Sequence, residues 1–227
     1  MHGSLRAVGR LTGALLASLF PADCLLCGRI LPWRQEGGVC LPCWQDLPWA
    51  PGFRPASGPL DALLWAADYE GPAGRLVRAL KFEDMDRLAV PLGRETAARI
   101  APLLALLRVD LVVPVPLHWW RHSRRGYNQA ALVARALARR AGLPLSTGAL
   151  ARRRAGRRQL GLSRQERLAS LAGCYAARVS RVRGRTILLV DDVVTTGATL
   201  EACARELRRA GAAGVVGCAF ARTARIT

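Results

Sequence analysis

Beyond residue 60, two patterns of hydrophobic residues alternate along the chain in a regular order. Short runs rich in Val, Leu and Ile predict buried strands, and longer segments with apolar residues three and four apart predict helices. The order strand, helix, strand, helix is typical of an α/β domain with a mainly parallel sheet. The predicted strands are Leu63–Tyr69, Leu111–Val115, Cys174–Val179, Thr186–Val190 and Val215–Phe220. The predicted helices are Ala73–Leu80, Leu92–Leu107, Asn128–Ala141 and Ala198–Ala210, each broken by Gly or Pro near an end.

The N-terminal segment combines basic and apolar residues as an export signal does. Arg6 and Arg10 precede the apolar stretch LTGALLASLF, and Cys24 follows it. Three features argue against export: Asp23 stands where a cleavage site needs a small residue, no A-x-A site follows, and the apolar positions have helical spacing. We therefore expect an amphipathic helix that packs on the protein, with Leu5, Val8, Leu15, Leu16 and Leu19 on its apolar face. No other stretch approaches the roughly twenty apolar residues of a membrane span.

A Pro- and Gly-rich run, PWAPGFRPASGPL from Pro48 to Leu60, marks the expected domain boundary. Runs of this composition are typical of linkers. We expect residues 1–50 to hold the amphipathic helix and a cysteine module, residues 51–60 to form the linker, and residues 61–227 to form the α/β domain.

The charge of the chain points toward phosphate-bearing partners but does not identify one. The formal net charge is +18, which favours nucleic acids, nucleotides or an anionic membrane surface. Lys81 is the only lysine, so nearly all of the positive charge is arginine in a chain that is also rich in Ala and Gly. Genome composition explains such a bias as well as selection for binding does, and both interpretations stay open.

Four of the seven cysteines form two Cys-x-x-Cys pairs, at Cys24 and Cys27 and at Cys40 and Cys43. This spacing predicts a tetrahedral structural Zn²⁺ site, for which Gly28, Gly37 and Gly38 supply tight turns. Four thiolates leave no open coordination position, so we expect the zinc to fold the module and not to catalyse. The alternative is two unrelated pairs in a reduced protein. Paired cysteines without an export signal favour a reducing cytoplasm. We expect the other three, Cys174, Cys203 and Cys218, to be buried as small hydrophobes.

The segment ILLVDDVVTTGAT, from Ile187 to Thr199, carries the clearest chemistry. An apolar strand is followed by two carboxylates, Asp191 and Asp192, and then by a small-residue turn at the start of a helix. The turn comprises Thr195, Thr196, Gly197, Ala198 and Thr199. Its N–H groups and hydroxyls suit a phosphate, whereas the carboxylates repel phosphate and suit ribose hydroxyls or a magnesium ion. A sugar phosphate satisfies both halves; the alternative is an ordinary strand-ending turn and helix cap.

This segment closely resembles the fingerprint of type I phosphoribosyltransferases. The resemblance implies a parallel sheet flanked by helices and a site for phosphoribosyl pyrophosphate, in which the acidic pair holds the ribose hydroxyls and the turn holds the 5-phosphate. It also implies that Mg²⁺ bridges substrate oxygens, and that Asp191 and Asp192 are the catalytic candidates.

The same resemblance assigns roles to two arginine-rich loops. The loop PLHWWRHSRRGYNQA corresponds to the pyrophosphate-binding loop, with Arg121, Arg124 and Arg125 as candidate contacts; the alternative is a solvated basic turn. The loop from Ala151 to Leu168 corresponds to a mobile flap over the reacting centre. Its candidate residues are Arg154, Arg158, Gln159, Ser163 and Arg167.

Taken together, the cysteine module, VVPVPL, RGYNQ, the Gln159–Arg167 pattern and VDDVVTTGATL resemble the ComF family of competence-associated, phosphoribosyltransferase-like proteins. Where relatives carry Asn before the strand after the flap, this chain has Ser170. The resemblance covers nearly the whole chain and implies a cytoplasmic bacterial protein linked to DNA uptake.

Two functions follow and are both left open. The chain is a phosphoribosyltransferase acting on an unknown acceptor, or it is a non-catalytic component of the transformation machinery that binds single-stranded DNA or a competence protein. Because only a few residues follow the last predicted strand, we expect residues before Leu111, the zinc module included, to form the acceptor site.

Overall fold

The computed structural model describes residues 23–32, 36–117, 126–154 and 164–224. The chain forms two compact units, one ending at Leu47 and the other beginning at Pro48. The first unit contains the 3₁₀ turn η1 (Glu36–Gly38) and the short helix α2 (Leu41–Gln45). The second unit is the α/β domain expected from the hydrophobic pattern.

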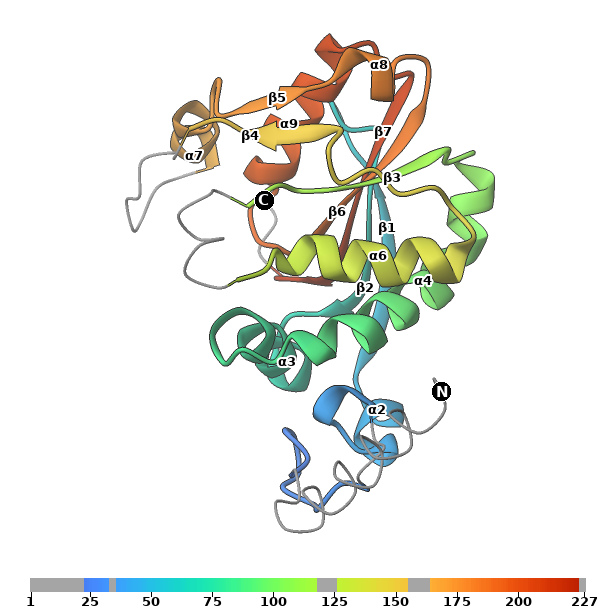
Figure 1. Ribbon diagram of the computed structural model, residues 1–227, viewed down its shortest axis with the longest axis vertical. Helices are drawn as coiled ribbons and strands as arrows, with labels where there is room; N and C mark the ends of the chain where they lie inside the picture. Colours follow the sequence, from blue (N-terminus) through green and yellow to red (C-terminus); the bar gives the residue numbers. More distant parts are fainter. Residues whose placement is uncertain (1–22, 33–35, 118–125, 155–163, 225–227) are drawn as a thin grey trace, which may run out of the picture. The chain divides into compact units, whose positions relative to one another are not determined.

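The α/β unit is built on a five-stranded sheet with the order β1-β2-β7-β6-β3 (Figure 1). Its strands are β1 (Trp49–Pro55), β2 (Ala62–Asp68), β3 (Leu111–Pro114), β6 (Thr186–Val194) and β7 (Gly214–Arg222). β2, β7, β6 and β3 run parallel, and only β1 is antiparallel to its neighbour. The parallel strands are largely buried, which explains their continuous apolar sequences. Burial extends over all of β3, over Ile187 to Val190 of β6, and over all but the last residue of β2 and β7.

Helices cover both faces of this sheet (Figure 1). One face carries α3 (Gly71–Phe82), the 3₁₀ turn η2 (Asp86–Leu88), α4 (Ala89–Leu106) and α6 (Gln129–Ala141). The other carries α9 (Ala198–Arg209) and a small antiparallel sheet of β4 (Leu150–Arg152) and β5 (Tyr175–Ala177). Two short helices, α7 (Arg164–Ser170) and α8 (Val179–Val182), flank β5 along the chain. The four predicted helices are confirmed, as are Cys174, Cys203 and Cys218 as buried residues.

The predicted linker is wrong in its first half, because residues 49–55 form the edge strand β1. β1 pairs antiparallel with β2, with an irregularity between Trp49 and Gly52. Edge strands tolerate proline, since one side of the strand makes no ladder hydrogen bonds. Gly52 lies opposite Trp65, and a Cβ there would fall 2.0 Å from the indole ring. The composition that resembled a linker therefore reflects an edge position and a close approach.

Two further strand predictions need correction. Cys174–Val179 contributes only Tyr175–Ala177, and this strand pairs with the unpredicted β4 outside the main sheet. β6 extends beyond Val190 to Val194, so the acidic pair lies inside the strand. The extension forms because β7 runs on to Arg222 and offers backbone partners as far as Val194.

None of the described helices is both long enough and apolar enough to cross a membrane.

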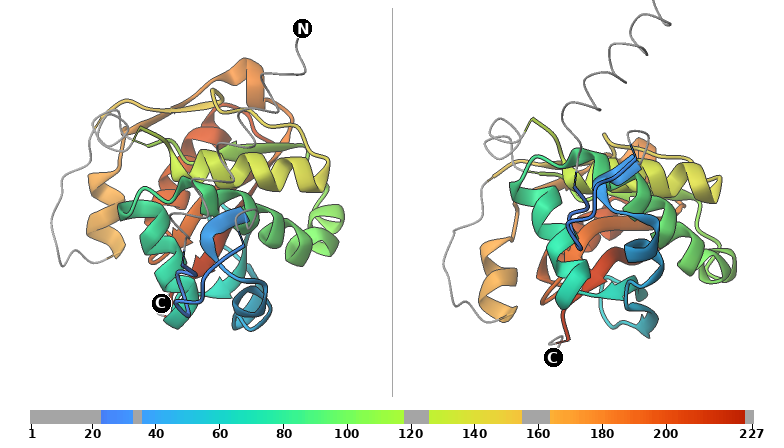
Figure 2. Two further views of the ribbon diagram at one scale, coloured as in Figure 1. Left: turned by 60° about the horizontal axis from the view of Figure 1, so that its bottom comes forward. Right: turned by 90° about the horizontal axis from the view of Figure 1, so that it is seen from below.

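Close contact between α4 and α6 fixes the helical layer, and the two helices lie side by side in different views (Figure 1, Figure 2). Gly93 makes this possible: a Cβ at this position would lie 2.4 Å from the Val133 carbonyl oxygen and 2.7 Å from Ala136 Cβ. Because the Val133 oxygen belongs to the backbone, it cannot move away from an added Cβ without shifting α6.

We expect Gly93→Ala to destabilise the α/β unit by roughly 1–3 kcal/mol, as overpacked cores do. Alanine has a higher helix propensity than glycine, by about 1 kcal/mol. Helix propensity alone therefore predicts that Gly93→Ala stabilises the protein. Urea unfolding would measure the change. A more stable variant would show that α4 and α6 are not closely packed at this point.

Candidate functional site

The two carboxylates of the phosphate loop lie on β6 and are engaged differently. The Lys81 ammonium, near the end of α3, forms an ion pair with Asp192 at 2.8 Å from Nζ to Oδ1. The Asp192 side chain is 8% exposed, and its backbone N–H donates to Asp191 Oδ1 at 2.9 Å. The only lysine of the chain therefore lies at the acidic pair, a site residue that the sequence analysis missed. Its uniqueness among 34 basic residues was the available clue.

Asp191 has an unusual protonation equilibrium. Burial, and then the neighbouring charge of Asp192, raise the pKa of its carboxyl to about 7, although Lys81 acts in the opposite direction. Both the protonated and the ionised form of the Asp191 carboxyl are therefore populated near neutral pH. Groups that donate hydrogen bonds to it would favour the ionised form.

The turn after β6 leads directly into helix α9 beside the acidic pair. Gly197 precedes the twelve-residue helix α9 with φ 77°, a conformation that glycine adopts readily. The Ala198 N–H lies 3.5 Å from Thr196 Oγ1, and the Thr223 hydroxyl donates to the Thr195 carbonyl at 3.4 Å. Thr195 and Thr199 line the same cavity as the acidic pair, whereas Thr196 and Gly197 line a neighbouring hollow.

The RGYNQ motif joins three elements beside the acidic pair. The Tyr127 hydroxyl donates to the Leu80 carbonyl at 3.0 Å, which connects the motif to the end of α3. Asn128 caps α6 by accepting from the Ala131 N–H, and its Nδ2 donates to the Val115 carbonyl at 3.1 Å. Gln129 is only 2% exposed, and its Nε2 has no partner among the described residues. The motif therefore places an unsatisfied donor in the cavity wall.

A second pair of donors comes from the small sheet at the base of the predicted flap. Arg152 and Tyr175 are partners in the β4–β5 register, and the guanidinium lies 5.4 Å from the ring centroid. The Tyr175 hydroxyl is buried and has no partner among the described residues. Burial raises the pKa of this hydroxyl, so it stays a neutral donor. The sequence analysis missed both residues because the small sheet forms only in the tertiary structure.

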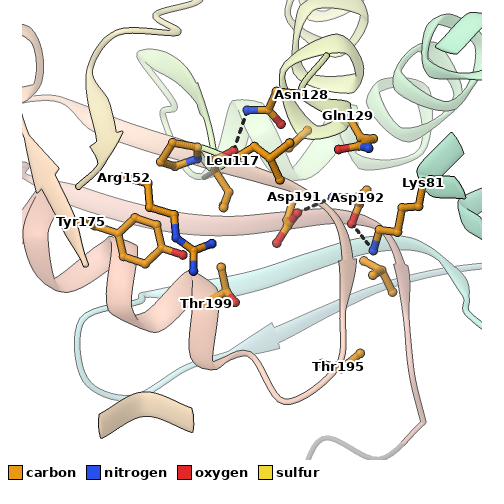
Figure 3. A pocket seen from close by; sticks show the side chains of 14 residues that line it. Lys81, Leu117, Asn128, Gln129, Arg152, Tyr175, Asp191, Asp192, Thr195 and Thr199 are labelled. Atoms are coloured by element: carbon orange, nitrogen blue, oxygen red, sulfur yellow. Dashed lines mark hydrogen bonds and ion pairs between the residues drawn. The ribbon is translucent and has the colours of Figure 1, made fainter. Parts of the chain in front are cut away.

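One polar cavity of about 260 Å³ brings most of these side chains together (Figure 3). Its polar lining residues are Lys81, Asn128, Gln129, Arg152, Tyr175, Asp191, Asp192, Thr195 and Thr199. The acidic pair lies between Arg152 and Tyr175 on one side and Lys81 and Gln129 on the other (Figure 3). The cavity thus presents acceptors in its middle and donors at both flanks.

Several predicted site residues lie outside the described residues. These are the pyrophosphate-loop candidates Arg121, Arg124 and Arg125 and the flap candidates Arg158, Gln159 and Ser163. Arg154 is exposed after β4 and is not among the described residues that line the cavity, and Arg167 belongs to α7.

The N-terminal unit gathers the four paired cysteines. The sulfur atoms of Cys24, Cys27, Cys40 and Cys43 all lie within 4.8 Å of one another. Cys27 Sγ and Cys40 Sγ are 3.7 Å apart, close to the about 3.8 Å that a tetrahedral zinc with 2.3 Å bonds requires. Gly28, Gly37 and Gly38 have positive φ, as their predicted turns require.

Protonation in this cluster also fits a cation. Burial raises the pKa of the Cys24 thiol, but N–H donors, including that of Cys40 at 3.3 Å, lower it overall to about 6. Burial and the neighbouring thiols raise the pKa of Cys43. A bound Zn²⁺ would supply the positive charge that stabilises clustered thiolates.

Comparisons with known proteins identify both parts of the chain. A family model described as a phosphoribosyl transferase domain matches residues 127–225, and one described as a double zinc ribbon domain matches residues 15–55. DNA utilization protein YhgH of Escherichia coli K12 is 34% identical over 195 residues, which cover 85% of this chain and 80% of that protein. Competence protein F of Haemophilus influenzae is 31% identical over 194 residues, covering 83% and 79%. The chain belongs to the ComF family.

This ComF protein thus combines a zinc-ribbon module with a phosphoribosyltransferase-type domain. Among solved structures, glutamine phosphoribosylpyrophosphate amidotransferase from B. subtilis is 21% identical, with a TM-score of 0.40 over 59% of the ComF chain and 26% of its own.

We expect purified protein to hold one zinc ion per chain and Cys24→Ala to lose it, because three thiolates leave the tetrahedral site incomplete. Cys218→Ala is the control, since this buried cysteine lies in β7. Elemental analysis would measure the metal. Equal zinc content in both variants would refute the four-cysteine site.

Replacing either carboxylate of the acidic pair by an amide should change the thermal stability, but in opposite directions for the two residues. Because the pKa of Asp191 is raised, its ionisation costs folding free energy above pH 7, and this cost disappears as the pH falls toward 4. Asp191→Asn should therefore raise Tm at pH 8 by a few degrees, at roughly 2–4 °C per kcal/mol, with the gain shrinking at lower pH. Asp192→Asn should lower Tm at pH 8, because Lys81 loses its partner. Calorimetry would test both, and a lower Tm for both variants contradicts the assigned protonation.

Proposed function

We propose that this ComF protein binds phosphoribosyl pyrophosphate, together with Mg²⁺, in the cavity at the carboxyl end of β6. The observation that carries the proposal is the acidic pair with Lys81, directly beside the Thr195–Thr199 turn. The α9 N-terminus suits a phosphate, whereas adjacent carboxylates suit hydroxyl donors. A ribose phosphate offers both groups at neighbouring positions. A nucleotide shares them and is the related ligand to compare.

The flanking donors support a ligand that is anionic at both ends. Gln129 Nε2 and the Tyr175 hydroxyl are buried without partners among the described residues, which costs roughly 1–3 kcal/mol for each group. Phosphate oxygens would satisfy them. Arg152 and Lys81 would add charge-assisted contacts at opposite flanks of the cavity.

We propose further that the site transfers the phosphoribosyl group to an acceptor. The acceptor nucleophile forms a bond to C1 of the ribose while the bond from C1 to the pyrophosphate oxygen breaks, and its electron pair leaves with pyrophosphate. Mg²⁺ neutralises the leaving group when bound. Asp191 and Asp192 would hold the ribose in one orientation, and the cationic side chains would stabilise the departing negative charge.

The names of the relatives support a setting for this chemistry. Proteins called DNA utilization protein and Competence protein F cover most of the chain. We therefore infer that the protein serves the use of incoming DNA, as an enzyme or as a ligand-binding component of that machinery.

We expect Mg²⁺ with phosphoribosyl pyrophosphate to raise Tm, and the double variant Asp191→Asn/Asp192→Asn to abolish this increase, because a ligand that binds only the folded state stabilises it. Isothermal titration calorimetry would give the affinity. Ribose 5-phosphate, pyrophosphate and AMP, tested alongside, would identify the part of the ligand that is recognised. Pyrophosphate release with a panel of acceptors would report turnover.

Glu95→Gln/Glu206→Gln is a matched control. It removes the same two charges from surface ion pairs with Arg99 and Arg209, away from the cavity. Binding that survives in the acidic-pair variant as well as in this control would exclude the proposed site.

A further inference from the structure

Lysine occurs once in this chain, and it lies at the acidic pair of the cavity. Of the 34 basic residues Lys81 is the only lysine, and the other 33 are arginine. The two side chains differ in chemistry: arginine holds a carboxylate through a rigid planar fork, whereas lysine carries a point charge on a flexible four-carbon stem. A chain that otherwise uses arginine for positive charge thus has, at this position, the cation that releases a carboxylate more readily.

The contacts of Lys81 allow it to change partner. Its ammonium meets one oxygen of Asp192, at 2.8 Å, and makes no other hydrogen bond or ion pair with the described residues. The Lys81 side chain is 23% exposed and lines the cavity. The end of α3 is held in place, because the neighbouring Leu80 carbonyl accepts from the Tyr127 hydroxyl. An exchange of partners therefore needs rotation about side-chain bonds and no movement of α3.

The ammonium and a divalent cation compete for the same carboxylate. Asp191 and Asp192 offer oxygen ligands of the kind that Mg²⁺ takes in proteins. The Lys81 ammonium on Asp192 repels a second cation brought to that side chain. Mg²⁺ alone has to displace the ammonium without offering it another partner. A ligand that carries its own negative charge removes this cost, since the ammonium can move to the ligand.

The position of Lys81 selects the part of the ligand that receives the ammonium. Thr199 lies on one side of the acidic pair, and Lys81 and Gln129 lie on the other (Figure 3). With the 5-phosphate at the turn and the ribose hydroxyls at the acidic pair, the pyrophosphate on C1 falls on the Lys81 side, because the C1 and C5 substituents leave the ribose ring at opposite ends. Gln129 Nε2, buried and without a partner among the described residues, adds a second donor there.

We propose that Lys81 is an exchangeable counter-ion that couples Mg²⁺ binding to the pyrophosphate group. It neutralises Asp192 in the free protein and transfers its ammonium to the pyrophosphate of the bound ligand, which makes the acidic pair available to Mg²⁺ and the ribose. This inference rests on the proposed function and adds a control to it. Mg²⁺ alone is kept from the acidic pair, and the ammonium is delivered to the group that leaves in the reaction.

Because Lys81 is the only lysine, its ammonium can be observed directly by NMR. Protein grown with isotope-labelled lysine gives a single side-chain signal, and this signal belongs to Lys81. We expect the signal to shift when phosphoribosyl pyrophosphate and Mg²⁺ are added together. It should stay in place with Mg²⁺ alone and with ribose 5-phosphate, which lacks the pyrophosphate. A shift of the same size with ribose 5-phosphate would contradict the exchange.

Lys81→Arg separates the exchange from a purely structural role. This variant keeps a positive charge beside Asp192, so its Tm should match that of the wild type. Its affinity for phosphoribosyl pyrophosphate with Mg²⁺, measured by isothermal titration calorimetry, should fall about tenfold or more, as loss of a charge-assisted hydrogen bond predicts. Lys81→Met should also weaken this binding, but it should tighten binding of Mg²⁺ alone, because the competing ammonium is gone.

Arg205→Lys is the matched control. It makes the reverse replacement in the surface ion pair with Glu201 and should change neither affinity. Equal binding of phosphoribosyl pyrophosphate by Lys81→Arg and the wild type would overturn the proposal, as would a Lys81→Met variant that binds Mg²⁺ alone no more tightly than the wild type does. A wild-type protein that does not bind phosphoribosyl pyrophosphate would refute the proposed function instead, so the two failures are distinguishable.

Discussion

Two adjacent carboxylates in a largely buried strand repel each other, and only Asp192 has an ion-pair partner among the described residues. Neighbouring residues of a strand point to opposite faces. Asp192 is met by Lys81 from α3, while Asp191 lies toward Arg152 and Tyr175 beside α9 (Figure 3). The site therefore takes its residues from elements on both sides of the sheet.

The same constraint explains why residues far apart in sequence are tied together here. The Tyr127 hydroxyl holds the end of α3 through the Leu80 carbonyl, next to Lys81, and Asn128 holds the end of β3 through the Val115 carbonyl. These bonds join the motif to the end of α3, which carries Lys81, and to the end of β3, which pairs with β6. Gln129, the next residue, lines the cavity, and its Nε2 has no partner among the described residues. The motif positions the site and also contributes to it.

Sequence analysis predicted those parts of the molecule whose signals are local. The strand and helix around Asp191 and Thr199, and the cysteine spacing, depend on near neighbours, and the family comparisons agree with both. Lys81, Arg152 and Tyr175 could not be placed from sequence, because only tertiary packing brings their strands and helices to β6. The Pro- and Gly-rich segment misled for a related reason: an edge strand and a linker have the same local composition, and only the pairing of Gly52 with Trp65 separates them.

The position of β7 has a consequence for how the sheet forms. This strand is the last described strand along the chain, yet it lies between β2 and β6 in the sheet. Ala62 must pair with Val216, across most of the α/β unit. Until β7 is in place, β2 and β6 have no common neighbour and each has an unpaired edge. Contacts between such distant segments form slowly, and exposed strand edges aggregate. Docking of β7 is therefore the step that closes the sheet and removes both open edges.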